Sequence, residues 1–345
     1  MAAVGVDLQF IKRIDMSIDL YQTDNTGLLL NVPLAPSTGF YEVTRNIGAV
    51  RNRGIEFSID ANVINIGKWR WDVGFNIGFN QNRVMDLPGY DKTTGEGGDF
   101  LQTASSIHQQ VKVGQDIYTW YLKEWAGVDP ANGDPLWYVV DEKGNYVLDA
   151  AGNKTTTNEY NATHEHAVGK ATPLFSGGLH TQLSWNGIFL HINSNFMYGN
   201  KIYNYSRHSS DVDGRLLDHN QLSIENSVLG WKRWEKPGDI ATHPKAMPNG
   251  NKSGEMYSSR YLEDGSYFRL KNLTVGYDFP AQLISKAHMT KCRIYFSADN
   301  LFTASKFSGM DPEITLETSD SKLAGMYTEN YPVGRTFQGG VEISF

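Results

Sequence analysis

The chain has 345 residues and a formal net charge of -7, which argues against a nucleic-acid partner. Its single cysteine, Cys292, excludes a disulfide within the chain. No apolar run approaches the roughly 20 residues of a membrane helix, and residues 1–7 lack the basic and apolar regions of a secretory signal.

Segments that alternate between apolar and polar side chains recur along the chain and predict β-strands. The clearest is 69–79, where every odd position is apolar and every even position is charged, Asn or Gly. Such a strand has one face in an apolar medium and the other in a polar one. In chain order, nine strands are predicted at residues 4–10, 14–20, 55–63, 69–79, 179–185, 188–198, 273–279, 292–298 and 341–345.

The connections between these strands alternate between short and long. The short ones lie at 12–13, 66–68, 186–187 and roughly 280–288, and Asn186-Gly187 is a strong hairpin signal because both residues accept positive φ. The long ones cover roughly 23–52, 84–173, 199–260 and 303–334. All tight turns therefore fall at one end of the sheet, as in outer-membrane barrels. Soluble domains rarely contain irregular loops of about 60 or 90 residues.

The apolar face of the strands could contact lipid or a protein core. The positions on this face contain no Lys, Arg, Asp or Glu. Lipid and a protein core both exclude charged side chains, and a charge that faces lipid costs about 2–4 kcal/mol. Aromatic residues lie near both ends of the strands, as in the aromatic belts of a membrane protein, although aromatics are common in strands generally. The loop pattern favours an antiparallel transmembrane β-barrel. The alternative is a secreted soluble β-sandwich that binds carbohydrate or acts in adhesion.

Several short motifs follow one another along the chain. They are NIGAVRNRGIEF at 46–57, WAGVDP at 125–130 with GDPLW at 133–137, GKATP at 169–173 with Gly177-Gly178, SRYLEDGSYFRLKNLTVGY at 259–277, ADNLF at 298–302, GMDPE at 309–313 and YP at 331–332. In this order they resemble the signatures of the SusC/RagA family of TonB-linked outer-membrane transporters. The resemblance covers the whole chain, and 259–277 is its most specific stretch.

The resemblance implies a barrel of about 22 strands with a plugged lumen, the largest class of transporter barrel. Nine strands are too few to close it, so residues 1–345 are expected to be the C-terminal part of the β-barrel. The plug domain, the TonB-interacting segment and the signal peptide would then be absent, and the fragment alone would not transport. By resemblance, the intact protein imports oligosaccharides or peptides through the Gram-negative outer membrane, together with a SusD-like lipoprotein lid.

Five tryptophans in the long connections are candidates for contact with a substrate or with the lid: Trp120, Trp125, Trp137, Trp231 and Trp234. Exposed loop aromatics can stack on sugar faces or anchor a partner. The alternative is that they pack the loops against one another, since long loops need small cores of their own. The chain ends in an alternating segment with Val341, Ile343 and Phe345, which resembles the assembly signal of outer-membrane barrels. The alternative interpretation is an ordinary terminal strand.

No pattern predicts catalysis, a cofactor or a metal site. Residues 129–134 and 211–214 are rich in Asx oxygens but lack the bidentate Glu of an EF-hand loop, so turns are predicted there. The cluster 164–166 holds two His and a Glu without further ligands at a fixed spacing. The sequence therefore predicts a transporter rather than an enzyme.

Overall fold

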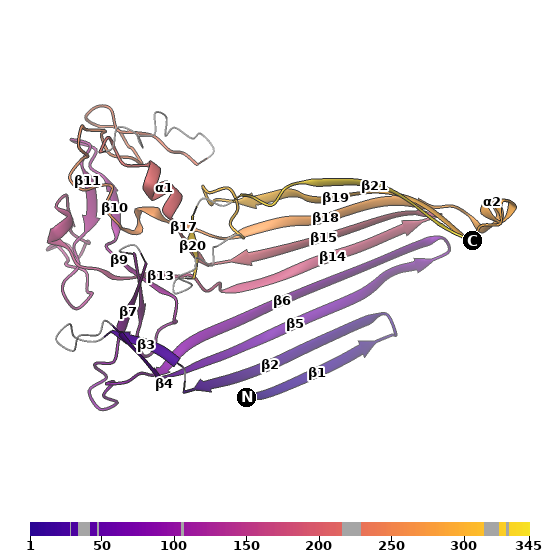
Figure 1. Cartoon of the computed structure of the whole chain (residues 1–345), viewed down its shortest axis with the longest axis horizontal. Coiled ribbons are helices and arrows are strands. Elements are labelled where there is room, and N and C mark those ends of the chain that lie inside the picture. The colour runs from indigo at the N-terminus through magenta and orange to yellow at the C-terminus, as the bar shows by residue number, and fades with distance from the viewer. Residues whose placement is uncertain are drawn as a thin grey trace.

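Nine long antiparallel strands form one continuous sheet in the computed structural model (Figure 1). The structure describes residues 1–27, 29–33, 42–46, 48–104, 107–215, 229–313, 324–328 and 331–345. Parts of the long connections predicted at 23–52, 84–173, 199–260 and 303–334 lie outside this range. The sheet order is β1 (Ala2–Phe10), β2 (Ile14–Thr26), β5 (Ala49–Ile66), β6 (Trp69–Asp86), β14 (Phe175–Trp185), β15 (Ile188–Tyr198), β18 (Tyr267–Asp278), β19 (Lys291–Ser305) and β21 (Thr336–Ser344). Each predicted strand corresponds to one of these, so the predicted strand set is confirmed.

The remaining elements are short and lie in the connections. The strands are β3 (Leu29–Pro33), β4 (Glu42–Asn46), β7 (Phe100–Ala104), β8 (Ile107–Val111), β9 (Thr119–Leu122), β10 (Trp125–Val128), β11 (Pro135–Tyr138), β12 (Thr156–Thr157), β13 (His166–Lys170), β16 (Lys201–Asn204), β17 (Leu262–Asp264) and β20 (Met326–Tyr327). The helices are η2 (Tyr160–Ala162), α1 (Tyr205–Ser210), η3 (Ser259–Tyr261), α2 (Ala281–Ile284) and η4 (Ser285–Ala287). Among the described residues, none of the helices is long and apolar enough to cross a membrane.

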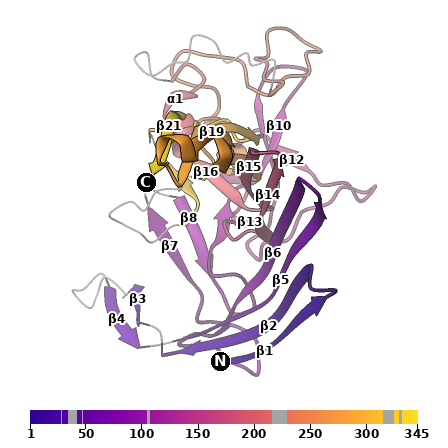
Figure 2. The ribbon, with the colours of Figure 1, turned by 90° about the vertical axis from the view of Figure 1, so that its right-hand side faces the viewer.

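All tight turns lie at one end of the sheet and all long connections at the other, as predicted (Figure 1). The turn between β14 and β15 has φ of 51° at Asn186 and 93° at Gly187, which the two-residue hairpin requires. The connection from β18 to β19 is longer and contains α2 and η4. Seen from the turn end, the sheet curves as an open arc with β1 and β21 at its two edges (Figure 2).

The apolar side chains of the nine strands share one face, which we call the outward face. Cross-strand pairing aligns Ile18 with Phe57, Phe57 with Ile77, and Phe196 with Phe268. Many apolar side chains on this face are solvent-exposed. In the described part of the chain no second sheet covers this face. In a soluble sandwich, by contrast, the apolar face would be buried against a second sheet. The opposite, inward face is polar.

Two polar groups within the apolar part of the outward face form hydrogen bonds within the sheet. Ser194 interrupts the alternation of β15, and its hydroxyl donates to the Leu179 carbonyl at 3.0 Å. Thr181 accepts from the Trp71 indole N–H at 2.8 Å. An unpaired polar group in hydrocarbon costs several kcal/mol, so these bonds make the outward face compatible with lipid.

Most of the buried hydrophobic residues among those described lie in the long connections, and a few lie in the strands of the sheet. The largest cluster contains Ile107, Trp120, Leu122, Tyr203, Tyr261 and Met326. A second contains Val50, Val84, Leu87 and Val111. The connection predicted as one long loop at 84–173 carries the short strands β7–β13, which period-2 alternation does not reveal because each has at most five residues. These connections, which we call the loop layer, fold around cores of their own.

Candidate functional site

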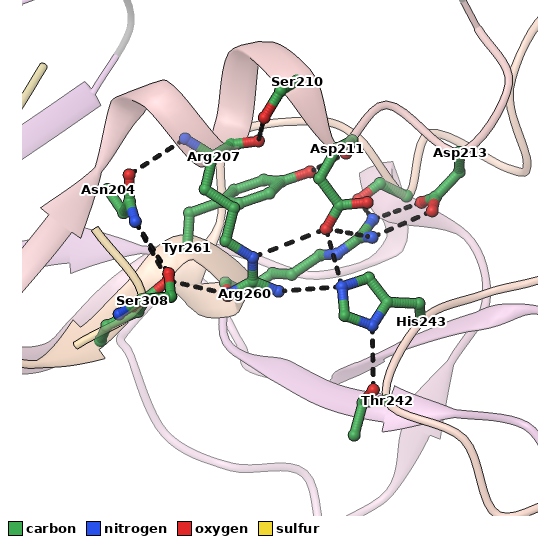
Figure 3. Close-up of polar contacts among 12 residues, drawn as sticks. Asn204, Arg207, Ser210, Asp211, Asp213, Thr242, His243, Arg260, Tyr261 and Ser308 are labelled. Atoms are coloured by element: carbon green, nitrogen blue, oxygen red, sulfur yellow. Dashed lines mark hydrogen bonds and ion pairs between the residues drawn. The ribbon is translucent and has the colours of Figure 1, made fainter. Parts of the chain in front are cut away.

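Charged side chains from distant parts of the sequence meet in the loop layer (Figure 3). We call this group the loop ion cluster; it consists of Arg207, Asp211, Asp213, His243, Arg260 and Glu263. Arg207 comes from α1, and both aspartates come from the turn that follows it. Arg260 comes from η3 and Glu263 from β17. The cluster therefore joins the two ends of the connection between β15 and β18.

Arg260 is the most buried cation of the cluster, with its side chain 1% exposed. Its guanidinium donates to both carboxylate oxygens of Asp213, lies 3.1 Å from an oxygen of Asp211, and donates to the Gly254 carbonyl at 2.8 Å. A charge buried this deeply must be paired. Arg260 is the second residue of the specific stretch 259–277, and this network gives that residue a structural role.

Arg207 connects the cluster to a second connection. Its backbone N–H donates to the side chain of the N-cap residue Asn204 at 3.0 Å, which satisfies a free donor at the start of α1. Its guanidinium donates to Glu263 at 3.1 Å. Glu263 also accepts from the backbone and the hydroxyl of Ser308, each at 2.7 Å. Ser308 follows β19, so the cluster ties together the connections on both sides of β18 and β19.

Burial and charge set the protonation of the cluster. Burial raises the pKa of Asp211, but the charge of Arg260 and a hydrogen bond with His243 outweigh it, so the pKa lies below its usual value. Burial lowers the pKa of His243, although Asp211 opposes the shift. His243 Nε2 lies 2.9 Å from Asp211 and Nδ1 lies 2.9 Å from the Thr242 hydroxyl. A neutral imidazole that donates to Asp211 and accepts from Thr242 fits these contacts.

A cavity of about 790 Å³ lies beside the cluster. Its lining combines amide and hydroxyl groups with aromatic and apolar side chains: Asn204, Ser206, Arg207, Ser210, Trp231, Ser308, Gly309, Met310, Tyr327, Tyr331 and Pro332. The Arg207 guanidinium carbon is 4.4 Å from the centre of the Trp231 ring and holds the indole at the cavity. Mainly apolar linings with a few polar groups are typical of ligand pockets of this size.

Among the five candidate tryptophans, three are buried inside the loop layer: Trp120, Trp137 and Trp234. The Trp120 indole donates to the Lys201 carbonyl at 3.1 Å, and that of Trp234 donates to the Pro130 carbonyl at 3.0 Å. A ligand could reach these three rings only if the loops opened.

Trp125 and Trp231 are half-buried. The Trp125 ring packs edge-on against Trp137 at 5.9 Å and lies 5.2 Å from the Arg260 guanidinium carbon. Trp231 is the only one of the five that lines the described cavity. Contact with a substrate or a lid stays a prediction for all five.

The other sequence predictions concern turns and the end of the chain. The turn predicted at 129–134 is confirmed, since Asp129 accepts from the Ala131 N–H at 2.9 Å. The turn predicted at 211–214 is also present, since the Arg215 N–H donates to the Val212 carbonyl at 3.0 Å. Asp211 and Asp213 of this turn belong to the loop ion cluster. In the segment 164–166, Glu165 and His166 lie 2.9 Å from His108 and Glu124, respectively. The terminal Val341, Ile343 and Phe345 are exposed, and their role in assembly stays a prediction.

A second ion network ties the segment after β19 to the sheet. The buried Arg269 of β18 donates to Asp311 and, at 2.6 Å, to Glu313. Lys271 adds bonds of 2.8 Å to both oxygens of Glu313. These residues belong to the motifs at 259–277 and 309–313. Each motif was visible in the sequence, but their direct contact was not.

The comparisons with known proteins agree with this architecture. A family model described as TonB dependent receptor-like, beta-barrel matches residues 3–163. The TonB-dependent receptor P3 of Formosa agariphila is 27% identical over 354 residues, covering 99% of this chain and 33% of that protein. The TonB-dependent receptor SusC of Bacteroides thetaiotaomicron is 26% identical over 352 residues, covering 99% and 31%. The solved structure of the RagAB peptide transporter aligns with a TM-score of 0.81 and 25% identity over 99% of this chain and 35% of that one.

Along its whole length the chain is similar to the family of TonB-dependent receptor β-barrels. It spans about a third of the length of the relatives it matches. Members of this family are outer-membrane β-barrel proteins, so the nine strands form part of a barrel wall. The outward face contacts lipid, the tight turns are periplasmic and the loop layer is extracellular. The predicted fold class, family and outer-membrane location are confirmed.

Proposed function

We propose that this chain forms the C-terminal part of the wall and the extracellular loops of a TonB-powered importer of large nutrients. The named relatives support this proposal, because SusC is a TonB-dependent receptor and RagAB is a peptide transporter. The wall has nine strands and an open arc. We propose that further polypeptide supplies the remaining strands, the plug and the TonB-interacting segment.

The observation that carries the proposal is the cavity of about 790 Å³ in an ordered extracellular layer. Its aromatic rings can stack on sugar rings or on apolar peptide side chains, and its amide and hydroxyl groups can fix their orientation. Oligosaccharides are the proposed cargo, with peptides as the alternative. A SusD-like lipoprotein lid would close over the same loops. The cargo would pass through chemically unchanged, so the proposed activity is transport rather than catalysis.

A binding and uptake experiment tests this role of the loop layer. Cells that carry the transporter with Trp231→Ala are given fluorescent oligosaccharides and, in parallel, fluorescent peptides. We expect uptake of the true cargo to fall at least tenfold, because the ring loses its stacking contact. The control is Trp185→Ala, which removes an indole on the outward face near the periplasmic turn.

Equal uptake by both variants, with normal amounts of protein in the outer membrane, would contradict the role of the cavity. Copurification of a lipoprotein with the wild-type transporter tests the lid separately. A transporter that is purified alone under mild conditions would contradict that part of the proposal.

A further inference from the structure

The outward face of β1, β2, β5 and β6 changes from apolar to charged over three rows near the extracellular loops. Cross-strand pairing defines an apolar row, a mixed row and a charged row: Val4–Leu20–Ile55–Phe79, Ala2–Gln22–Arg53–Gln81 and Asp24–Arg51–Arg83. The apolar row is between 44% and 67% exposed, as expected for side chains that face lipid. The two upper rows contain three arginines, Arg51, Arg53 and Arg83, which we call the arginine patch.

The arginine patch is only partly neutralised by the residues that the structure describes. Arg51 pairs with Asp24, with its Nε 2.6 Å from a carboxylate oxygen. Among the described residues, Arg53 donates to the neutral Gln81 at 2.7 Å. Among the described residues, no carboxylate lies within ion-pair distance of Arg53 or Arg83. Arg83 also lies directly opposite Arg51, an arrangement of like charges that destabilises a sheet. An anion bound beside Arg83 would reduce this repulsion.

The positions of the arginines suit a phosphate group. Diagonal neighbours on adjacent strands are about 7–8 Å apart, and an arginine side chain can span much of this distance. Arg53 and Arg83 are such neighbours. The guanidinium fork matches phosphate oxygens in a bidentate manner and is less strongly hydrated than an ammonium group. Two of these side chains can therefore converge on one phosphate.

The apolar row indicates a lipid rather than a free anion. A cavity of about 630 Å³ is lined by Leu20, Ile55 and Phe79 of the apolar row and by Arg53 of the mixed row, with Lys170 at its border. Elsewhere near this end of the wall the outward face presents aromatic side chains, such as Phe175, Tyr198 and Phe302. On the segment from β1 to β6, cations therefore lie directly above an apolar bed.

We propose that the arginine patch binds the phosphate of a multiply acylated glycolipid in the outer leaflet, with an acyl chain along the apolar row. Such a lipid supplies both the negative charge above and the hydrocarbon below. The proposal depends on the outer-membrane orientation of the wall but not on the cargo or on a lid. It also assigns a role to Arg51 and Arg53, which lie in the motif at 46–57.

The test is the amount of glycolipid that remains bound when the transporter is extracted from outer membranes in mild detergent. Mass spectrometry of the extracted lipid gives moles of phosphorylated glycolipid per mole of protein. We expect a stable ratio for the wild type and at least a fivefold lower ratio for the double variant Arg53→Gln/Arg83→Gln. The control is Arg70→Gln, which removes an arginine of β6 from the inward face near the periplasmic turn.

Equal glycolipid ratios for the double variant and the wild type would overturn the proposal. So would loss of the glycolipid on washing with inorganic phosphate alone, since the apolar row would then contribute nothing. If the double variant does not reach the membrane, Arg53→Lys/Arg83→Lys keeps the charges but removes the forks, and we expect an intermediate ratio. An unchanged ratio in that variant would contradict bidentate binding. Normal glycolipid binding with failed nutrient uptake would contradict only the proposed function.

Discussion

Arg260 is the residue on which the order of the loop layer depends most. Its side chain is 1% exposed and faces two carboxylates. Replacing it with Met would leave Asp211 with Arg207 and His243, and Asp213 with Arg233. We expect a loss towards the lower end of the roughly 3–5 kcal/mol seen when a buried pair is broken. We expect faster amide hydrogen exchange in 205–215 and 229–261, with no change in the wall. Arg70→Met, at an exposed position, is the control. Equal exchange rates in both variants would show that the cluster does not hold the loops.

His208 gives the loop layer a dependence on pH. Burial lowers its pKa from 6.5 to about 4, and its ring stacks on Tyr257 at 4.4 Å. The unfolded segment binds a proton below about 6.5, whereas the folded one binds it only near 4. The free energy of unfolding is therefore highest above pH 6.5 and falls as the pH drops towards 4, by up to about 3 kcal/mol.

Limited proteolysis of the loop layer at pH 7.5 and pH 4.5 measures this effect. We expect cleavage to accelerate at the lower pH in the wild type and much less in His208→Phe, which keeps the ring but cannot be protonated. His164→Phe, at an exposed position, should behave like the wild type. If His208→Phe retains the full acceleration, another group is responsible, such as His166 or His243, whose pKa values burial also lowers.

At the scale of the element, β6 shows why the wall could be predicted and the loop layer could not. The two faces of β6 follow from its local alternation. Its pairing with β5 follows from the short turn between them, and its other neighbour is β14, which forms a hairpin with β15. Arg260 instead meets Asp211 and Asp213 across nearly fifty residues of sequence. No period in the sequence marks such a contact. The motif at 259–277 was visible, but its partners were fixed only by the three-dimensional path of the loops.

The same strand provides a test of which face contacts lipid. Phe75 lies on the outward face and stacks on Phe196 at 6.1 Å between ring centres, whereas Asn76 is exposed on the inward face. Phe75→Arg would place a charge in the hydrocarbon at a cost of about 2–4 kcal/mol, so we expect much less protein in the outer membrane. Asn76→Arg should be inserted normally. Comparable amounts of both variants in membrane fractions would contradict the assigned faces.

At the scale of the whole molecule, the tryptophans report the level of the membrane. Three of the eight lie on the outward face near the periplasmic turns, namely Trp69, Trp71 and Trp185, and the other five lie in the loop layer. Trp69 and Trp185 stack at 5.3 Å and form part of an aromatic belt. In this arrangement only these three tryptophans reach lipid. Phospholipids with brominated acyl chains should therefore quench only the fluorescence that these three tryptophans contribute to the membrane-inserted transporter.

Substituting these three tryptophans with Phe should abolish the lipid-dependent quenching that this chain contributes, while Trp231→Phe should leave it unchanged. A background transporter without tryptophan outside residues 1–345 makes the signal specific. If quenching persisted in the triple variant, lipid would have to reach the loop layer, and the border between wall and loops would lie elsewhere. If Trp231→Phe reduced it, the cavity would be open to lipid. The border matters beyond this measurement, because the arginine patch can meet a lipid phosphate only if the hydrocarbon ends at the row from Val4 to Phe79.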